Sequence, residues 1–237
     1  MSSGEAKNLF KFFTIFFFID FGNHPLSHLM KNVFGYHNKG SFEIYCYALS
    51  PSDRSVWRRG IEEDCDVFRD VSDWKCDEVA KRIINDQIHV LVNLNGYTKG
   101  AKNEIFALRP APIQISLMGF CGTMGADFVD YIVGDEVSIP PHMSPHFSES
   151  IIRLPNSYFV TDHRQSARYV LDHEDRPTRG DYNIPEDAFV FANFSQNYKF
   201  SPNLISSWVK ILKNVRNSIL WLLKFPPEGE DNLKAEV

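Results

Sequence analysis

The segment HVLVNLNGYTKGAKNEIFALRPAPIQISLMGFCGTMGADFVDYIVGD, His89–Asp135, decides the fold of this chain. Three short apolar runs in it have the composition of buried parallel strands: His89–Leu94, Ile113–Met118 and Phe128–Val133. The residues between the first two runs suit a helix that Pro110 ends, and Thr98 is expected to cap that helix. Strands that alternate with a helix in this way predict an α/β unit, in which ligands bind at the carboxyl ends of the strands.

The same alternation continues outside this segment. Upstream, we expect strands over Phe42–Ala48 and Asp66–Asp70 and helices over Val56–Asp64 and Asp73–Asp86, and downstream a strand over Ile151–Leu154. In the second of these helices, apolar residues recur at a spacing that makes one apolar face. Helices that alternate with strands predict a parallel sheet covered on both faces.

A second α/β unit follows a polar and basic stretch, Asp162–Gly180, which we interpret as an interdomain linker. We expect strands over Ala188–Asn193 and Ser218–Leu223, with the helix Pro202–Asn214 between them. The predicted organisation is an N-terminal α/β domain over residues 20–160, a linker over 161–182 and the truncated start of a second domain over 183–237.

Residues 1–19 form a divergent apolar N-terminal segment. Its apolar run, Asn8–Ile19, is shorter than the roughly 20 residues of a membrane span, and no small-residue cleavage site follows it. We therefore favour a first buried strand that leads into Asp20, and we expect no membrane association.

The composition argues against a general nucleic-acid binder. The formal net charge is −5, with acidic and basic residues interspersed, whereas such binders present a basic face. The four cysteines include no C-x-x-C pair, which is typical of reduced thiols in a cytoplasmic or nuclear protein.

Several distinctive segments of the sequence resemble the catalytic region of the protein O-linked N-acetylglucosamine transferases. The deciding segment carries GYTKGAKNEIFALRPAPIQ and GFCGTMGADFVDYIVGD, Asp20–Met30 reads DFGNHPLSHLM, and Phe194–Pro202 reads FSQNYKFSP. The resemblance covers most of Ile19–Gly229. It implies a glycosyltransferase B-type fold: a nearly complete N-terminal Rossmann-like parallel-sheet domain and the start of a second one.

The resemblance also implies a reaction. The reaction is transfer of N-acetylglucosamine from UDP-N-acetylglucosamine to serine or threonine hydroxyls of intracellular proteins, with inversion and without a metal or other cofactor. The partners are then a sugar nucleotide and protein or peptide acceptors.

Three residues are candidates for catalysis. His24 can orient a group or accept a proton, because an imidazole in general titrates near neutrality. A histidine that only hydrogen-bonds backbone explains the residue equally well without the resemblance. Asp20 could position His24 or serve as a turn residue. Lys199 could stabilise a diphosphate together with the amino end of the helix near Pro202, or it could be a solvated loop lysine.

The binding residues are implied by the same matches. The donor-binding set is Gln196, Lys199, Met118, Gly119 and Cys121, and the acceptor-binding set is Asn23, Tyr97, Thr98 and Lys99. Gly119 would let backbone approach the sugar, and Cys121 replaces a proline common in the family. A helix cap alone would also account for Thr98.

The geometry that these roles require can be stated in advance. Asp20, His24, the loop Tyr97–Lys99 and Gly119 should converge at one edge of a parallel sheet, because each follows a strand, and Lys199 should face that edge.

Other functions stay open. The chain could be a non-catalytic fragment or scaffold that keeps the fold, or a related sugar-nucleotide enzyme such as an epimerase. We expect the 237-residue chain to be an incomplete catalytic region that does not transfer sugar at a useful rate by itself.

Overall fold

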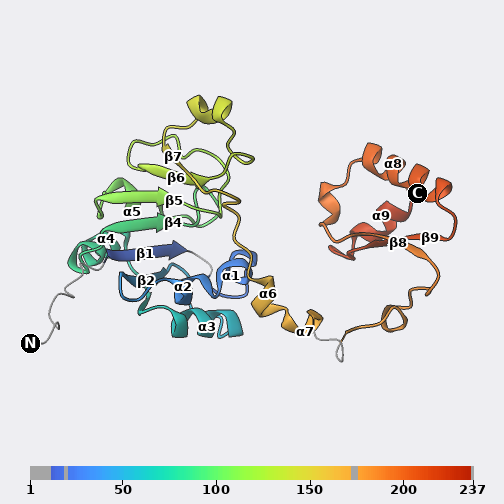
Figure 1. The fold of residues 1–237 in the computed structure, drawn as a ribbon, viewed down its shortest axis with the longest axis horizontal. Coiled ribbons are helices and arrows are strands. Elements are labelled where there is room, and N and C mark those ends of the chain that lie inside the picture. Colours follow the sequence, from blue (N-terminus) through green and yellow to red (C-terminus); the bar gives the residue numbers. More distant parts are fainter. Residues whose placement is uncertain (1–11, 19–20, 172–175, 236–237) are drawn as a thin grey trace, which may run out of the picture. The chain divides into compact units, whose positions relative to one another are not determined.

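The computed structural model describes residues 12–18, 21–171 and 176–235, and it divides the chain into two compact units, Met1–Arg168 and Tyr169–Val237. Each unit is an α/β structure, as the sequence predicts (Figure 1). In the described ranges, no helix is both long and apolar enough to span a membrane.

The larger unit is built on a parallel sheet. The described strands follow the order β3-β2-β1-β4-β5-β6-β7, and every neighbouring pair is parallel. The strands are β1 (Phe12–Phe18), β2 (Phe42–Ala48), β3 (Val67–Asp70), β4 (Val90–Asn93), β5 (Ile113–Ser116), β6 (Tyr131–Gly134) and β7 (Ser150–Arg153). Because all of them run the same way, their carboxyl ends lie at one edge, where the arrowheads point in Figure 1.

The strand order reverses between β1 and β4. The chain moves outward from β1 through β2 to β3, and then returns to β4 on the other side of β1. Such a reversal opens a crevice outside the carboxyl ends of the two central strands, which is where open α/β sheets bind their ligands. The sequence predicted the strands but not this order.

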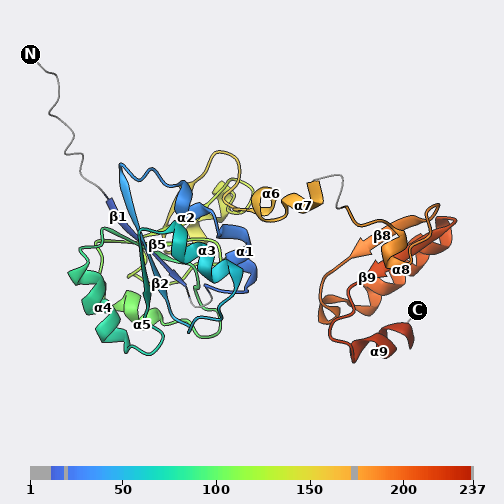
Figure 2. The same ribbon diagram turned by 90° about the horizontal axis from the view of Figure 1, so that it is seen from below.

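Helices cover the two faces of the sheet in separate groups (Figures 1 and 2). The helices of the larger unit are α1 (Pro25–Met30), α2 (Val33–Tyr36), α3 (Val56–Asp64), α4 (Cys76–Asn85), α5 (Asn103–Ala107) and α6 (His163–Ser166). One apolar core joins the sheet to α1–α3 through Met30, Phe34 and Ile61. A second core joins the other face to α4 and α5 through Ile83 and Phe106.

The N-terminal apolar run is a central strand of this sheet. β1 pairs with β2 on one side and with β4 on the other. Phe16 is buried in the first core, whereas Phe12 at the start of the strand is exposed. The interpretation of this run as a buried strand is therefore confirmed, and Ile19 and Asp20 lie outside the described residues.

Three expected elements have clearly different bounds, and the first of them, β6, begins at Tyr131 and not at Phe128. β5 stops at Ser116 and not at Met118, because the chain turns at Met118, where φ is 62°, and the Gly119 amide donates to the Leu117 carbonyl at 3.0 Å. The second amphipathic helix begins at Cys76 and not at Asp73, because the preceding residues form a turn.

The smaller unit holds a parallel two-stranded sheet. β8 (Phe189–Asn193) and β9 (Ser218–Leu222) are joined through α8 (Pro202–Asn214), and α9 (Gly229–Ala235) follows. Before them, the polar stretch that we interpreted as a linker contains the short helices α6 and α7 (Arg168–Leu171) and a 3-10 turn, Gly180–Tyr182.

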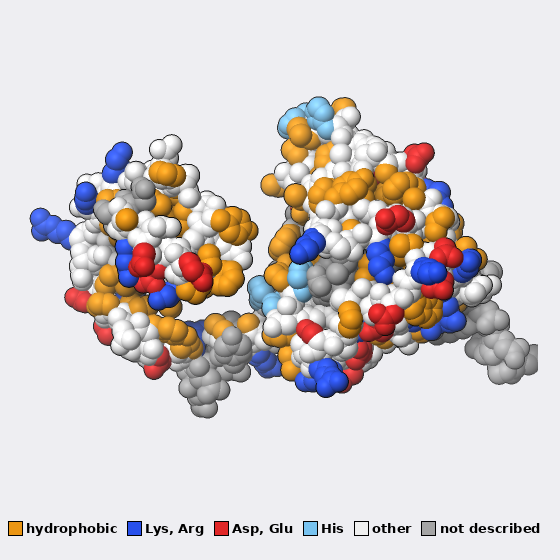
Figure 3. All heavy atoms as spheres, turned by 180° about the vertical axis from the view of Figure 1, so that it is seen from behind, with side chains coloured by type: hydrophobic (Ala, Val, Ile, Leu, Met, Phe, Trp, Pro, Cys, Tyr) orange, Lys and Arg blue, Asp and Glu red, His pale blue; other side chains and the backbone are white. Residues whose placement is uncertain are grey.

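Surface charge is mixed on the side of the molecule seen in Figure 3. Lysine and arginine side chains alternate there with aspartate and glutamate. This distribution fits the net charge of −5 and gives that face no basic patch.

Candidate active site at the carboxyl edge of the larger sheet

His24 begins α1 just beyond the end of β1. Its Nδ1 accepts a hydrogen bond from the Leu26 amide at 3.2 Å, so the imidazole caps the helix, and Pro25 occupies the first helical position, where no amide hydrogen is needed. The half-buried ring therefore lies at the carboxyl edge beside the reversal of strand order.

Asn23 precedes His24 and is held at two points. Its amide donates to Asp53 Oδ2 at 2.6 Å, and its Oδ1 lies 3.0 Å from His28 Nε2. The His28 ring stacks on Trp57 with the ring centroids 4.2 Å apart. Asn23 is exposed, so its side chain is at the surface of the same edge.

The loop Tyr97–Lys99 follows β4, on the other side of the reversal. Asn93 Oδ1 accepts the amides of Asn95 and Gly96 at 2.8 and 3.0 Å, which turns the chain sharply at the strand end. All three residues of the loop are exposed. They are therefore placed where an acceptor could reach them.

Thr98 does not cap a helix, so that expectation is wrong. α5 begins after Lys102, and Thr98 Oγ1 instead donates to the Asn95 carbonyl at 2.9 Å. The same carbonyl receives the Thr98 amide at 3.1 Å. Thr98 closes a turn within the loop, and the helix starts five residues further on, at Asn103.

Gly119 brings the third loop, after β5, against the first two. A side chain at this position would collide with the Leu94 carbonyl oxygen, and its Cβ would lie 3.3 Å from Leu26 Cδ2. The contact atoms belong to the end of β4 and to the start of α1. The structure therefore places His24, the Tyr97–Lys99 loop and Gly119 at one edge of the sheet.

The neighbours of Gly119 differ in their exposure. Met118 is buried in the first core, and its Sδ lies 3.4 Å from the amide nitrogen of Val160. Cys121 is an exposed free thiol. Of the expected donor residues in this bend, Gly119 and Cys121 reach the surface, whereas Met118 supports them from below.

A buried carboxylate that sequence reasoning missed fixes the bend after Gly119. Glu149, which is 4% exposed, accepts the Thr123 hydroxyl and the Met124 amide, each at 2.6 Å. The Tyr97 hydroxyl donates to the Met124 carbonyl at 2.7 Å. Glu149 precedes a short edge strand and belongs to no recognisable motif, so the sequence offers little indication of its role.

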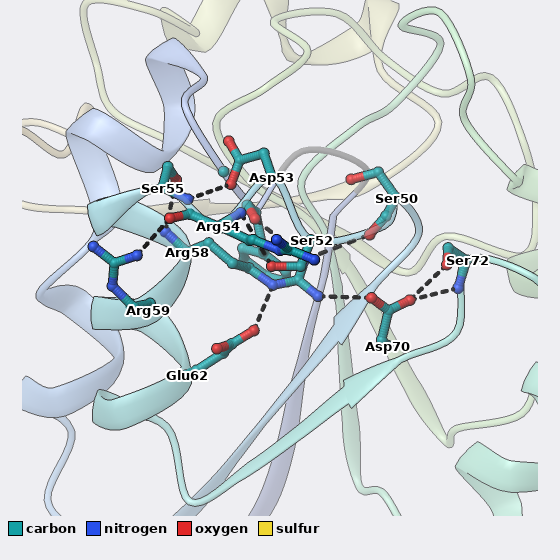
Figure 4. Close-up of polar contacts among 12 residues, drawn as sticks. Ser50, Ser52, Asp53, Arg54, Ser55, Arg58, Arg59, Glu62, Asp70 and Ser72 are labelled. Atoms are coloured by element: carbon teal, nitrogen blue, oxygen red, sulfur yellow. Dashed lines mark hydrogen bonds and ion pairs between the residues drawn. The ribbon is translucent and has the colours of Figure 1, made fainter.

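A buried guanidinium ties three strand ends together (Figure 4). Arg58, 1% exposed, donates to the carbonyls of Phe21 and Ser50 at 3.2 and 3.4 Å and to Asp70 at 2.9 Å. Its Nε donates to Glu62 at 2.7 Å. Because Phe21 and Ser50 follow β1 and β2 and Asp70 is the last residue of β3, Arg58 sets the positions of the three strand ends relative to one another.

Gln196 and Lys199 belong to the smaller unit. Gln196 precedes the 3-10 turn Asn197–Lys199 between β8 and α8, and Lys199 is the last residue of that turn. Ser201 caps α8 by accepting the Leu204 amide at 3.3 Å. Lys199 is exposed, with Nζ 5.9 Å from the Tyr198 ring centroid. The two side chains and the amino end of α8 thus lie in one short stretch after a strand.

Two expectations remain, the role of Asp20 and the absence of a metal site. Asp20 lies outside the described residues. Within the ranges that are described, no three His, Cys, Asp or Glu side chains are placed to hold a metal ion.

Comparison with known proteins defines the class. The fold is similar to that of the Thermobaculum terrenum O-GlcNAc transferase mutant K341M, with a TM-score of 0.76, 23% identity, and coverage of 95% of this chain and 42% of that one. The chain therefore has the fold of a glycosyltransferase of the B type.

The family follows from the sequence match. The model of glycosyl transferase family 41 matches residues 11–176 and 173–237, so the chain belongs to this family. It is 53% identical over 211 residues to a probable UDP-N-acetylglucosamine–peptide N-acetylglucosaminyltransferase, SEC, of Arabidopsis thaliana, covering 89% of this chain and 22% of that protein. It is 31% identical over 322 residues to the UDP-N-acetylglucosamine–peptide N-acetylglucosaminyltransferase of Caenorhabditis elegans, covering 91% and 28%. The chain thus spans between a fifth and a third of the length of these relatives.

Proposed function

We propose that this chain is part of an inverting transferase that moves N-acetylglucosamine from UDP-N-acetylglucosamine to serine or threonine hydroxyls of intracellular proteins. One observation carries the proposal: in a family 41 chain, His24, the Tyr97–Lys99 loop and Gly119 meet at the carboxyl edge where the strand order reverses. The relatives are named for this donor and for peptide acceptors.

The larger unit would hold the acceptor and the sugar. Asn23, Tyr97, Thr98 and Lys99 lie on the surface of the edge, where they can bind an acceptor peptide. Gly119 leaves room for the sugar to approach the backbone, and Cys121 lies beside it. His24 orients the reacting groups, because its position is fixed by the cap of α1.

The smaller unit would stabilise the leaving group. In glycosyl transfer, negative charge grows on the oxygen that links the sugar to the diphosphate. A lysine and oriented amides can stabilise that charge without a metal. Lys199, Gln196 and the capped amino end of α8 supply these groups.

The compartment would be the cytoplasm or the nucleus. Cys46, Cys65, Cys76 and Cys121 are free thiols, and Cys121 is exposed. Exposed thiols of this kind persist in reducing compartments. Protein acceptors and the sugar nucleotide would be the partners there, with no role for nucleic acid or membrane.

A chimera tests the proposal. Residues 12–235 would replace the aligned segment of the Arabidopsis relative, and transfer of radiolabelled N-acetylglucosamine to a serine-containing peptide would be measured. We expect multiple turnovers, and a His24→Ala chimera should lose most of them. A folded chimera that transfers nothing, beside an active unmodified relative, would overturn the proposal.

The same samples separate the alternatives. An epimerase would convert UDP-N-acetylglucosamine into an isomer without any peptide, which proton NMR of the nucleotide sugar detects. A scaffold would bind peptide and leave the donor unchanged. Either result in place of transfer would assign that function instead.

A further inference from the structure

The turn that carries His24 is held from outside by one carboxylate. Asp53 Oδ2 accepts the Asn23 amide at 2.6 Å, and Asp53 Oδ1 accepts the Ser55 amide at 2.9 Å. The carboxylate thereby bridges the loop after β1 and the start of α3 (Figure 4). A Cβ at Gly22 would lie 2.6 Å from Asp53 Oδ2, so this approach requires glycine beside Asn23.

Two further residues near Asp53, Trp57 and Arg58, also hold the segment around His24. Arg58 donates to the Phe21 carbonyl, and Trp57 stacks on His28, whose Nε2 lies 3.0 Å from Asn23 Oδ1. The amide oxygen of Asn23 can only accept, so His28 donates from Nε2. Contacts of Asp53, Trp57 and Arg58 therefore hold the residues on both sides of His24.

The hydrogen bonds of this turn determine which nitrogen of His24 carries the proton. The turn brings the His24 amide to the Gly22 carbonyl at 2.8 Å and places Nδ1 as acceptor of the Leu26 amide. A neutral imidazole has one acceptor and one donor nitrogen, so Nε2 is the protonated one. The acceptor nitrogen of His24 is therefore already used by the backbone of α1.

We propose that Asp53 is a positioning residue that locks the Asn23–His24 turn and thereby holds His24 in the Nε2-protonated form. This goes beyond the site assembled above, in which Asp53 has no assigned role. The consequence for the reaction rests on the proposed function: neither ring nitrogen of neutral His24 could then accept a proton, so another group would remove the hydroxyl proton.

Nitrogen NMR of the histidine rings tests the lock in the 237-residue chain. Protonated and unprotonated ring nitrogens have clearly separated resonances, so the tautomer is read directly. In the native chain we expect His24 to show Nε2 protonated and Nδ1 unprotonated. In Asp53→Ala, both resonances should move toward those of an exposed histidine of the same chain, His142.

Two further variants keep the test decisive. Asp77→Ala removes another exposed carboxylate, which pairs with Lys81 at 3.0 Å on α4, and should leave His24 unchanged. Asp53→Asn keeps one acceptor oxygen and should give an intermediate shift, and it replaces Asp53→Ala if that variant does not fold. Unchanged His24 resonances in a folded Asp53 variant, or a native His24 protonated on Nδ1, would overturn the inference.

The catalytic consequence is measured separately in the chimera. We expect Asp53→Ala to lower kcat by about tenfold to a hundredfold, the usual effect of a small misplacement of a reacting group. The donor KM should change little. A tautomer shift without any transfer activity in the parent chimera would support the lock and contradict the proposed function, so the two failures are distinguishable.

Discussion

Tyr97 and Thr98 each commit a hydroxyl proton to a backbone carbonyl. The acceptors are Met124 and Asn95, at 2.7 and 2.9 Å. Each hydroxyl oxygen keeps lone pairs, so toward a bound peptide substrate these side chains accept hydrogen bonds. They suit the amide hydrogens of an extended peptide, which fits the acceptor role proposed for this loop.

Lys199 is the residue at which the leaving-group argument can be tested. In the chimera we expect Lys199→Ala to lower kcat by about a hundredfold, because one preorganised charge on a developing anion contributes about 3 kcal/mol. Donor affinity should fall less, since the charge grows toward the transition state. Steady-state kinetics with varied donor measure both.

The matched control is Lys210→Ala, which removes an exposed lysine of α8 in the same unit. It should leave kcat unchanged. Full turnover of Lys199→Ala combined with weaker peptide binding would move Lys199 from the leaving group to the acceptor.

His28 makes the stability of the edge depend on pH. Partial burial lowers the pKa of His28 below 6.5, and nearby His24 and His163 lower it further. Because the folded chain disfavours the protonated ring, the contribution of His28 is complete above pH 6.5 and is lost as the pH falls below that value.

We therefore expect the free energy of unfolding of the native chain to decrease more steeply between about pH 7 and about pH 5 than that of His28→Gln. Urea denaturation at a series of pH values measures the difference. His142→Gln, at an exposed site, should keep the native slope. Identical slopes for all three chains would show that His28 ionises as freely in the folded state as in the unfolded one.

The role of a residue could be predicted from the sequence where it depends on the residue type and on the element just before it. The chemistry of His24 and Lys199 follows from their type and from the strand that precedes each. The contacts of Asp53 and Glu149 join segments tens of residues apart, such as Asn23 with Asp53 and Thr123 with Glu149. No local pattern encodes such partners, so sequence reasoning missed both carboxylates.

At the scale of the elements, Arg58 of α3 links the ends of β1, β2 and β3. Its planar guanidinium serves four acceptors and stacks 4.4 Å above the Phe68 ring. A lysine ammonium is a point donor and cannot satisfy these directions together. The carbonyls of Phe21 and Ser50 would then lose the hydrogen bonds that Arg58 donates to them.

We expect Arg58→Lys to lower the free energy of unfolding by about 2 to 4 kcal/mol, in the range observed when buried acceptors lose a charged donor. Urea denaturation monitored by tryptophan fluorescence measures it. Arg59→Lys, on the exposed face of the same helix, should cost under about 0.5 kcal/mol. Equal effects of the two substitutions would contradict the linking role of Arg58.

The elements with a clear period were predicted closely. β2, α3 and α8 have the bounds that the sequence predicts. α5 was predicted to start too early, because Thr98 has the composition of a cap but uses its hydroxyl in a turn. Strand order was not predictable, because neighbouring parallel strands are joined through helices and share the same apolar composition.

At the scale of the whole molecule, the two units differ in how much apolar surface they bury. The larger unit has two cores on opposite faces of its sheet. In the smaller unit, every residue of β9 is only half-buried. A two-stranded sheet with so little burial is marginally stable on its own.

We expect hydrogen exchange to separate the two units. Amides of β4, at the centre of the larger sheet, should exchange slowest, and those of β8 and β9 should exchange much faster. Mass spectrometry of peptides after timed exchange measures both in one experiment. Equal protection of β4 and β9 would show that the described units unfold as one.

Position 119 is open to solvent and yet closed to every side chain. The space that a side chain would enter is occupied by the carbonyl of Leu94, the residue directly after β4. Gly125, in the same bend, has φ of 59° and nothing within 4 Å of its absent Cβ. In a library that encodes all amino acids at both positions, selection for folded protein should leave glycine alone at 119, whereas asparagine and aspartate should persist with glycine at 125. Mutational tolerance at this edge would then follow the path of the backbone and not the depth of burial.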